Sequence, residues 1–191
     1  MIEAILNGVL IILLYSGNMG QKQGLEILAQ AADLLKTNPK VVLILCGNGP
    51  GRAGLVDLCA GLSNVRFLDL QPMERLSALL GMADIHLLPQ RADAADLVMP
   101  SKLTGMLASG RPVVATAHLE TELASVVACC GLVVEPEQPK GFAEAIRVLA
   151  NDSILRTQLG RAARVYAEAH LDRAVVLCQF EAELLKLCGR D

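Results

Sequence analysis

Glycines and a lysine separate an apolar run from a helical pattern near the start of the chain, in the stretch YSGNMGQKQG from Tyr15 to Gly24. Gly17 and Gly20 lack side chains, so backbone N–H groups can approach a ligand closely, and Lys22 adds a full positive charge. Such a loop suits a negatively charged group such as a phosphate. A tight strand-to-helix connection with a solvated lysine is the alternative that this loop alone leaves open.

A second lysine follows a later apolar run, in the stretch from Pro89 to Thr116. There Pro100-Ser101-Lys102 opens a helical pattern. Ser101 is expected to cap this helix through its hydroxyl, and Lys102 falls in the first turn, where its charge opposes the helix dipole. That local conflict makes sense if an anion binds beside Lys102. An ordinary surface lysine is the alternative.

Two further loops carry glycine-rich or polar sequence. CGNGPG, from Cys46 to Gly51, matches neither G-x-G-x-x-G nor a P-loop, because its glycines alternate and no G-K-[ST] occurs in the chain. A dinucleotide-binding fold and a P-loop NTPase are disfavoured, while Gly49 stays a cleft candidate. HLETEL follows another apolar run, and Glu120 or Glu122 could touch a ligand there, although each taken singly is more often an ordinary helix-start acid.

Six short apolar runs precede or follow these loops, and they indicate strands buried on both faces of a parallel sheet, because they are continuous rather than alternating. They are Val9–Tyr15, Val41–Cys46, Val65–Leu70, Ile85–Leu88, Val113–Ala115 and Leu132–Val134. Helical patterns lie between them, so the sequence predicts a doubly wound, Rossmann-like α/β sheet of about six strands. Ligands bind such sheets beyond the carboxyl ends of the strands, where the loops above would lie.

The last third of the chain has helical periodicity to its end. Three helices are predicted there, around Phe142–Leu149, Leu155–Tyr166 and Leu177–Leu187. No internal repeat or long linker interrupts the pattern. We therefore expect residues 1–191 to form a single lobe, with a lead-in over residues 1–8 and a helical tail over residues 137–191.

Composition disfavours several classes of function. The net charge is -3 and no long basic run occurs, which argues against nucleic acid or acidic membranes as the main partner. Aromatic residues make up 3% of the chain and Trp is absent, so aromatic surfaces that stack on the bases of single-stranded nucleic acid or on sugar rings are not expected. The six cysteines form no C-x-x-C and predict free thiols in a reducing cytoplasm. The apolar start lacks a basic segment, carries Glu3 and is too short to span a bilayer.

Several stretches, taken in order, resemble the carboxyl-terminal lobe of family-four glycosyltransferases, which are two-lobed GT-B-type enzymes that use nucleotide-sugar donors. The stretches are YSGNMGQKQGLEILAQAADLL, LILCGNGPGRAGLVDLC, NVRFLDLQPMERLSALLGMADIHLLPQ, PSKLTGMLASGRPVVAT, CGLVVEP and AIRVLANDSILRTQLGRAARVYAEAH. The resemblance covers nearly everything from Tyr15 to His170. The Pro-Ser-Lys variant is most similar to the branch that builds bacterial exopolysaccharide, including the colanic-acid type.

The resemblance implies roles for particular residues around the diphosphate of the donor. Lys22 matches the family lysine that contacts the diphosphate from the first loop, and Gly17 and Gly20 make room for phosphate oxygens. Asn18 stands where many members carry arginine, so a second charge is missing there. Ser101 and Lys102 fall beside the phosphates.

The acids of the family pattern are absent. The family often has two glutamates eight residues apart, and the nearest positions here are Leu97 and Gly105. The second glutamate normally holds the ribose hydroxyls. Asp96 is the acid nearest to the first position and is the one catalytic candidate that the resemblance offers. A loop whose backbone often meets the nucleobase edge corresponds to Leu70, Gln71 and Pro72.

The resemblance implies transfer of a sugar from a nucleotide diphosphate-sugar to an acceptor in polysaccharide or glycoconjugate biosynthesis. The acceptor-binding amino-terminal lobe has no counterpart here, so the chain alone is expected to be inactive. No metal, other cofactor or transmembrane segment is expected. The expected location is the cytoplasm, and the full-length enzyme could be a peripheral protein of the inner membrane. A non-catalytic lobe that binds a nucleotide or a partner is one alternative. An epimerase-like lobe is another, although it would want several acids and histidines and the chain has three His in all.

The sequence also predicts where the two lysines lie relative to each other. Lys22 and Lys102 should lie on the same side of the sheet, with exposed side chains that converge on one anion site at the carboxyl ends of the strands.

Overall fold

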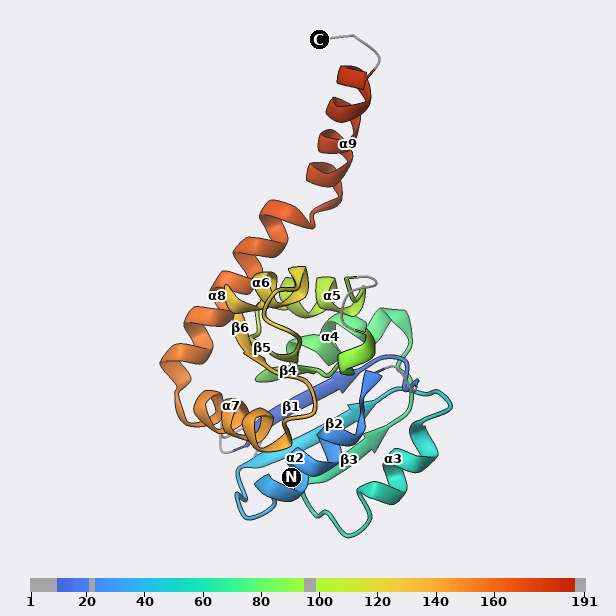
Figure 1. Cartoon of the computed structure of the whole chain (residues 1–191), viewed down its shortest axis with the longest axis vertical. Helices are drawn as coiled ribbons and strands as arrows, with labels where there is room; N and C mark the ends of the chain where they lie inside the picture. The colour runs from blue at the N-terminus through green and yellow to red at the C-terminus, as the bar shows by residue number, and fades with distance from the viewer. Residues whose placement is uncertain (1–9, 21–22, 95–98, 188–191) are drawn as a thin grey trace.

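The computed structural model describes residues 10–20, 23–94 and 99–187 and shows a parallel sheet covered by helices on both faces (Figure 1). The strand order is β3-β2-β1-β4-β5-β6, and every neighbouring pair is parallel. The strands are β1 (Ile11–Ser16), β2 (Val41–Cys46), β3 (Val65–Leu68), β4 (Ile85–Leu88), β5 (Val113–Thr116) and β6 (Gly131–Val134). The predicted doubly wound sheet of about six strands is confirmed.

Strand ends differ slightly from the apolar runs. β2 and β4 have the predicted bounds, whereas β1 ends at Ser16, one residue beyond the predicted run, and Val9 lies outside the described residues. β3 is shorter than predicted, because the chain leaves the sheet after Leu68, and Leu70 is 68% exposed. An apolar residue just past a strand end was therefore counted as part of the strand.

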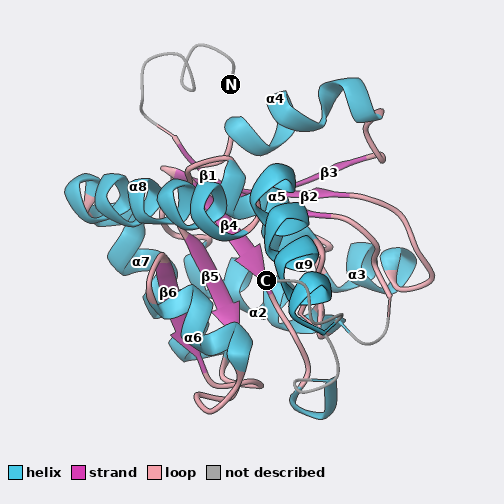
Figure 2. Cartoon of the chain, turned by 90° about the horizontal axis from the view of Figure 1, so that it is seen from above, coloured by secondary structure: helices cyan, strands magenta, loops and turns pink. Residues whose placement is uncertain are grey.

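Each face of the sheet has its own helices, because successive residues of a strand point to opposite sides. The helices are α2 (Glu26–Leu35), α3 (Arg52–Leu58), η2 (Met73–Arg75), α4 (Leu76–Gly81), η3 (Ala92–Ala94), α5 (Lys102–Ala108), α6 (Glu122–Ala128), α7 (Pro139–Asn151), α8 (Ser153–His170) and α9 (Arg173–Leu187). Leu13 and Tyr15 of β1 belong to the core cluster with α2, α3 and α7, whereas Leu14 packs with α4. Figure 2 shows α4 on one side of the sheet and α2 and α3 on the other. Val113 and Ala115 of β5 pack with α5, α6 and α8.

The helical tail covers the sheet and then leaves it. α7 packs on α2, and Arg147 Nη2 donates to the Leu34 carbonyl at 2.8 Å. α8 packs on α5, and α9 projects away from the rest of the chain (Figure 1). No residue of α9 is buried, and Phe180 is 62% exposed. The three predicted tail helices are confirmed, and the apolar residues of α9 after the half-buried Val175 are exposed in the part of the chain that the structure describes.

The described cysteines are all free thiols, namely Cys46, Cys59, Cys129, Cys130 and Cys178, while Cys188 lies outside the described residues. Over residues 10–20, 23–94 and 99–187, no helix has both the length and the apolar character needed to cross a membrane.

The point where strand order reverses lies between β1 and β4. From β1 the chain continues outward to β2 on one side, and from β4 it continues to β5 on the other side. The described residues that follow β1 (17–20 and 23–25) and β4 (89–94 and 99–101) therefore border this switch point at the carboxyl edge of the sheet. Sheets of this topology bind their ligands at such a point.

Candidate functional site

The loop after β1 is anchored on the loop after β2. Gly17 N–H donates to the Cys46 carbonyl at 3.0 Å. Met19 is fully buried; its N–H donates to the Asn48 carbonyl at 2.8 Å, and its carbonyl accepts from Gly51 N–H at 2.7 Å. These contacts fix the path of the first turn after β1. Met19 was not selected from the sequence, although a methionine inside a polar, glycine-rich stretch is the signal that could have pointed to it.

The glycines of the loop after β2 let it approach the first loop closely. Gly47 has φ +149°, and a Cβ there would lie 1.9 Å from the Gly17 carbonyl oxygen. A Cβ at Gly49 would lie 2.6 Å from Asn18 Oδ1 and 2.7 Å from the Met19 carbonyl oxygen. Only glycine tolerates both this backbone conformation and this proximity. Gly49, proposed from the sequence as a cleft residue, therefore has a packing role between the two loops.

The Lys102 side chain reaches from the start of α5 to the end of β1. Its Nζ donates to Tyr15 Oη at 3.0 Å and lies 4.4 Å from the centre of the Tyr15 ring. It also lies over Gly17, where an added Cβ would be 3.7 Å from Lys102 Nζ. The Tyr15 hydroxyl in turn donates to the Asn18 carbonyl at 2.5 Å. The structure thus brings together Gly17, Asn18 and Lys102, around a tyrosine that sequence reasoning did not select.

Burial changes the chemistry of this group. Loss of solvent lowers the pKa of Lys102 to about 8, and burial raises the pKa of Tyr15 well above its usual value. The expectation that the Lys102 side chain is exposed was therefore wrong, because the side chain folds over Gly17 and Tyr15. The ion pairs of the described residues include none with Lys102. A partly buried ammonium with no counter-charge is costly, and an anionic ligand would relieve that cost.

The loop after β4 lies on the other side of the switch point. Thr116 Oγ1, at the end of β5, accepts from Gln90 N–H at 2.6 Å and donates to the Gln90 carbonyl at 2.7 Å. A Cβ at Gly24 would lie 3.3 Å from backbone atoms of Gln90 and Arg91, so the two loops touch at that position. Arg91 Nε pairs with Asp93 Oδ1 at 3.0 Å. The described parts of the loops after β1 and β4 are therefore each tied to a neighbouring strand or loop.

The other residues predicted to bind phosphate are Ser101, Gly20 and Lys22. The expectation that Ser101 caps α5 was wrong: its backbone is already helical, with φ −56° and ψ −28°, and its side chain makes no capping hydrogen bond. Gly20 follows Met19 in the first loop, where an added Cβ would meet Gln23 Oε1 at 2.7 Å. Lys22 and Asp96 lie outside the described residues, so the convergence of Lys22 with Lys102 stays a prediction.

The acids after β5 lie at a helix start. Thr121 Oγ1 accepts from Ala124 N–H at 3.2 Å and caps α6, and Glu122 is exposed in the first turn of that helix, where a negative charge is favourable. Glu120 is also exposed. Among the described residues, neither carboxylate makes a hydrogen bond or an ion pair, so both fit the ordinary helix-start interpretation.

The loop after β3 presents apolar side chains at the carboxyl edge. Leu70 is 68% exposed and Met73 is 76% exposed, and Pro72 is exposed between them. Gln71 Nε2 donates to the Asp69 carbonyl at 2.9 Å, which holds the turn. Residues 70–72 therefore sit two strands away from β1, on the same edge as Lys102.

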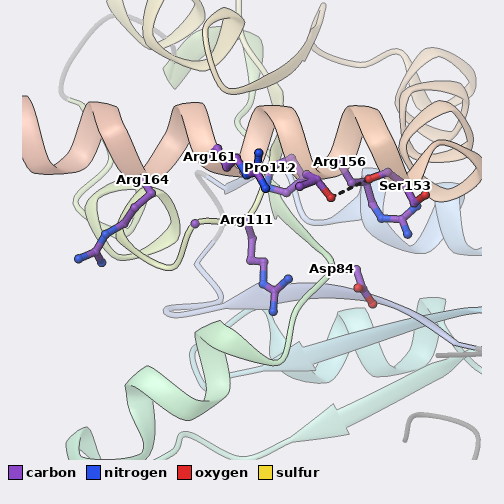
Figure 3. A pocket seen from close by; sticks show the side chains of 10 residues that line it. Asp84, Arg111, Pro112, Ser153, Arg156, Arg161 and Arg164 are labelled. Carbon is purple, nitrogen blue, oxygen red and sulfur yellow. Dashed lines mark hydrogen bonds between the residues drawn. The ribbon is translucent and has the colours of Figure 1, made fainter. Parts of the chain in front are cut away.

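A separate cavity of about 390 Å³ opens at the opposite edge, where β4 and β5 begin (Figure 3). It is lined by four arginines, Arg111, Arg156, Arg161 and Arg164. Three of them donate to carbonyls in the last turns of helices: Arg111 to Gly81 of α4 at 2.9 Å, Arg164 to Ala108 of α5 at 2.7 Å, and Arg156 to two carbonyls of α7. Helix carboxyl ends carry unsatisfied carbonyls and partial negative charge. These three arginines are explained as helix caps, so the candidate site is the carboxyl edge of the sheet at Lys102.

Comparison with known proteins places this fold in a family. The family model described as Glycosyl transferases group 1 matches residues 11–152. The chain belongs to the group 1 glycosyl transferases. One curated relative of this group 1 chain is WcaI of Escherichia coli (strain K12), a glycosyl transferase assigned to colanic acid biosynthesis. The two are 43% identical over 177 residues, which cover 88% of this chain and 42% of WcaI.

Solved structures share the fold of this group 1 chain. Sucrose-phosphate synthase from Thermosynechococcus elongatus superposes with a TM-score of 0.78 at 23% identity, over 98% of this chain and 48% of that one. Alr3699/HepE of Anabaena, solved in complex with UDP, gives a TM-score of 0.75 at 18% identity, over 97% of this chain and 51% of that one. The chain thus spans about half the length of these proteins. The resemblance to the carboxyl-terminal lobe of GT-B-type family-four glycosyltransferases is confirmed.

Proposed function

We propose that this chain is the donor-binding lobe of a glycosyltransferase that moves a sugar from a nucleotide diphosphate-sugar to an acceptor in polysaccharide or glycoconjugate biosynthesis. The observation that carries the proposal is the Lys102 ammonium. It is partly buried, hydrogen-bonded to Tyr15 and without an ion-pair partner among the described residues, at the point where strand order reverses. Membership of the group 1 family and the likeness to WcaI support the substrate class.

The chemistry that this site would assist is departure of a nucleoside diphosphate. When the bond between the sugar carbon and the diphosphate oxygen breaks, the electron pair stays on that oxygen, and negative charge develops on the phosphate. A cation fixed beside that oxygen stabilises the charge more in the transition state than in the ground state and lowers the barrier. Lys102 supplies this cation in the proposal, and Lys22, Gly20 and Ser101 add further contacts.

The remainder of the nucleotide is proposed to lie along the carboxyl edge toward β3. Adjacent strands are about 4.8 Å apart, so the loop after β3 lies roughly 10 Å from β1. A nucleotide with its diphosphate at Lys102 would extend its base toward Leu70, Gln71 and Pro72, where the exposed leucine offers an apolar surface. No metal is included in the proposal, because the lysines supply the positive charge beside the phosphates.

This chain spans 42% of WcaI and 51% of Alr3699/HepE. The acceptor is proposed to bind to a second lobe that lies outside this chain. We therefore expect donor binding, but no sugar transfer, from these residues alone. A cytoplasmic location, peripheral at the inner membrane in the longer enzyme, goes with this proposal, and the free thiols fit a reducing compartment.

A non-catalytic lobe that binds a nucleotide is the second candidate function. Position 105, where the family often has a glutamate, is a glycine, and a Cβ there would lie 3.0 Å from Leu80 Cδ1. A glutamate would therefore need Leu80 to move. A transfer assay on a protein extended to the length of its relatives separates the two functions, because tight nucleotide binding without turnover would favour the non-catalytic lobe.

The test of donor binding is calorimetry on the 191-residue chain with UDP, GDP, ADP and UMP. We expect one nucleoside diphosphate to bind more tightly than the monophosphate, and Lys102→Met to weaken that binding roughly tenfold or more, since one charge-assisted contact contributes about 1.5–3 kcal/mol. Lys36→Met is the matched control, because Lys36 is exposed at the far end of α2 and pairs with Asp33. Absence of binding at millimolar concentration, or equal binding by Lys102→Met, would overturn the proposal.

A further inference from the structure

Tyr15 stands near the carboxyl end of the central strand β1 and is fully buried. Its hydroxyl has two partners, since it donates to the Asn18 carbonyl at 2.5 Å and accepts from Lys102 Nζ at 3.0 Å. A phenol has a single proton, so donation to Asn18 turns a lone pair of the oxygen toward the lysine. One oxygen atom thus links the loop after β1 to a side chain that is 87 residues away in the sequence.

We propose that Tyr15 is a positioning residue for the donor phosphates: its hydroxyl holds the Lys102 ammonium over Gly17, at the place where the diphosphate binds. The inference rests on the proposed function, because it deepens the description of the same phosphate site. The ring also lies under the ammonium, with Nζ 4.4 Å from its centre, and the bare Gly17 leaves room for the lysine. The lysine therefore has a hydrogen-bond acceptor, an aromatic ring and an open backbone around it.

A fixed lysine binds phosphate better than a free one. A lysine side chain has several rotatable bonds, and ordering them on binding weakens the affinity that the contact would otherwise give. Tyr15 orders Lys102 before the ligand arrives. Because the same hydroxyl also holds the Asn18 carbonyl, the loop beside the phosphate is fixed by the same residue.

A neutral partner suits this task better than an acid. Burial raises the pKa of Tyr15 well above its usual value, so the phenol keeps its proton at neutral pH even beside an ammonium. It accepts a hydrogen bond without neutralising the charge of Lys102, whereas a carboxylate at this place would form an ion pair and compete with the phosphate. For the same reason Tyr15 does not serve as a proton acceptor in the reaction.

Few charged groups surround Lys102 in the described part of the chain. Its hydrogen bonds there include one titratable partner, Tyr15 of β1. Arg91, from the loop after β4, is paired with Asp93. Lys22 and Asp96 lie outside the described residues and also carry charge. The pH dependence of binding is therefore compared between variants that all keep both residues.

The experiment measures the affinity for UDP, with GDP as second probe, from pH 7.0 to 9.5 in the full chain and in Tyr15→Phe, Tyr166→Phe and Lys102→Met. The chain has two tyrosines, and Tyr166 lies on α8 against His170, so Tyr166→Phe is the matched control. Loss of the acceptor disfavours the ammonium form. In Tyr15→Phe we therefore expect roughly tenfold weaker binding at pH 8 and a midpoint of the pH dependence that moves to lower pH. The control should match the unchanged chain.

Failure of the inference and failure of the proposed function give different results. If Tyr15→Phe lowers the affinity by the same factor at every pH, or leaves it unchanged, while Lys102→Met weakens binding roughly tenfold or more, the positioning role is wrong and the phosphate site stands. If Lys102→Met binds UDP and GDP normally, or the unchanged chain binds neither, the proposed function fails and the inference with it.

A second measurement does not depend on the folding of Tyr15→Phe. In the Tyr166→Phe chain labelled at tyrosine Cζ with ¹³C, the single resonance should move as UDP is added and should also move as Lys102 loses its proton near pH 8. A resonance that responds to neither would overturn the positioning role.

Discussion

Replacing Lys102 by Met is expected to make the folded chain more stable while it weakens nucleoside diphosphate binding. Burial lowers the pKa of this lysine from 10.5 to about 8, which corresponds to about 3 kcal/mol of free energy disfavouring the charged form. Residual solvent screens part of this cost, and the variant also loses the hydrogen bond to Tyr15, a loss of about 1 kcal/mol. Met keeps most of the side-chain volume, so we expect a net gain of about 1–2 kcal/mol in the free energy of unfolding at pH 7.

The gain depends on pH with a definite sign. Between pH 8 and pH 10.5 the unfolded chain still binds the Lys102 proton while the folded chain releases it, so the stability of the unchanged chain rises with pH through this window. The variant lacks that rise, and its advantage is full below pH 8 and vanishes toward pH 10.5. Thermal denaturation should show a Tm about 2–8 °C higher at pH 7 and a smaller difference at pH 9.5.

The binding arm uses the same variant. UDP affinity should fall roughly tenfold or more, because a charge-assisted contact to phosphate is lost. Lys36→Met should change neither quantity by more than about 0.5 kcal/mol, since Lys36 is an exposed residue of a surface pair. A Lys102→Met chain that is less stable than the unchanged chain at pH 7 and binds UDP equally well would refute the reasoning, because Lys102 would then be a packing residue.

Three further outcomes are expected. His86 is fully buried, and burial lowers its pKa to about 4. As the pH falls from 6.5, the unfolded chain takes up the His86 proton before the folded chain does, so the free energy of unfolding measured in urea should drop by up to about 3 kcal/mol by pH 4. His86→Gln should flatten that decline. Gly47→Ala should cost about 3 kcal/mol or more of stability and weaken UDP binding, because the new Cβ would meet the Gly17 carbonyl. Gly54→Ala, in open space on α3, should cost nothing in the same denaturation series. UDP affinity measured by calorimetry should fall between 50 and 500 mM NaCl, and less steeply in Lys102→Met, since screening acts on a charge the variant lacks.

The fold was predictable because the strands are short apolar runs covered on both faces. β4 is buried at every position and its bounds follow from Ile85–Leu88 directly. The predicted strand bounds were wrong where an apolar run continues past the end of the strand, as it does to the exposed Leu70 after β3. The exposure of α9 could not be predicted from its helical pattern: among its described residues Val175 is half-buried, and the apolar residues after it are exposed.

The site was predictable to the extent that local features mark it. Gly17 was selected as a glycine after a strand, Lys102 as a lysine at a helix start, and Asn18 from the family resemblance. The sheet topology brings the three together. Tyr15 was missed, since its contact with Lys102 joins positions far apart in the sequence and the residue looked like the last member of an apolar run. The capping role of Ser101 was wrong because capping requires an extended backbone, and Ser101 is already helical.

Contact between Lys102 and a nucleoside diphosphate is the central claim, and lysine ¹⁵Nζ NMR tests it most directly. The Lys102 resonance, assigned by its absence from the Lys102→Met spectrum, is followed as UDP or UMP is added at pH 7 and as the complex is titrated to pH 10. We predict a saturable shift that is larger with UDP than with UMP, and a pKa that rises above about 8 when the phosphate is bound, because the anion favours the ammonium form. Saturation of the chain by UDP with an unmoved Lys102 resonance would contradict the account.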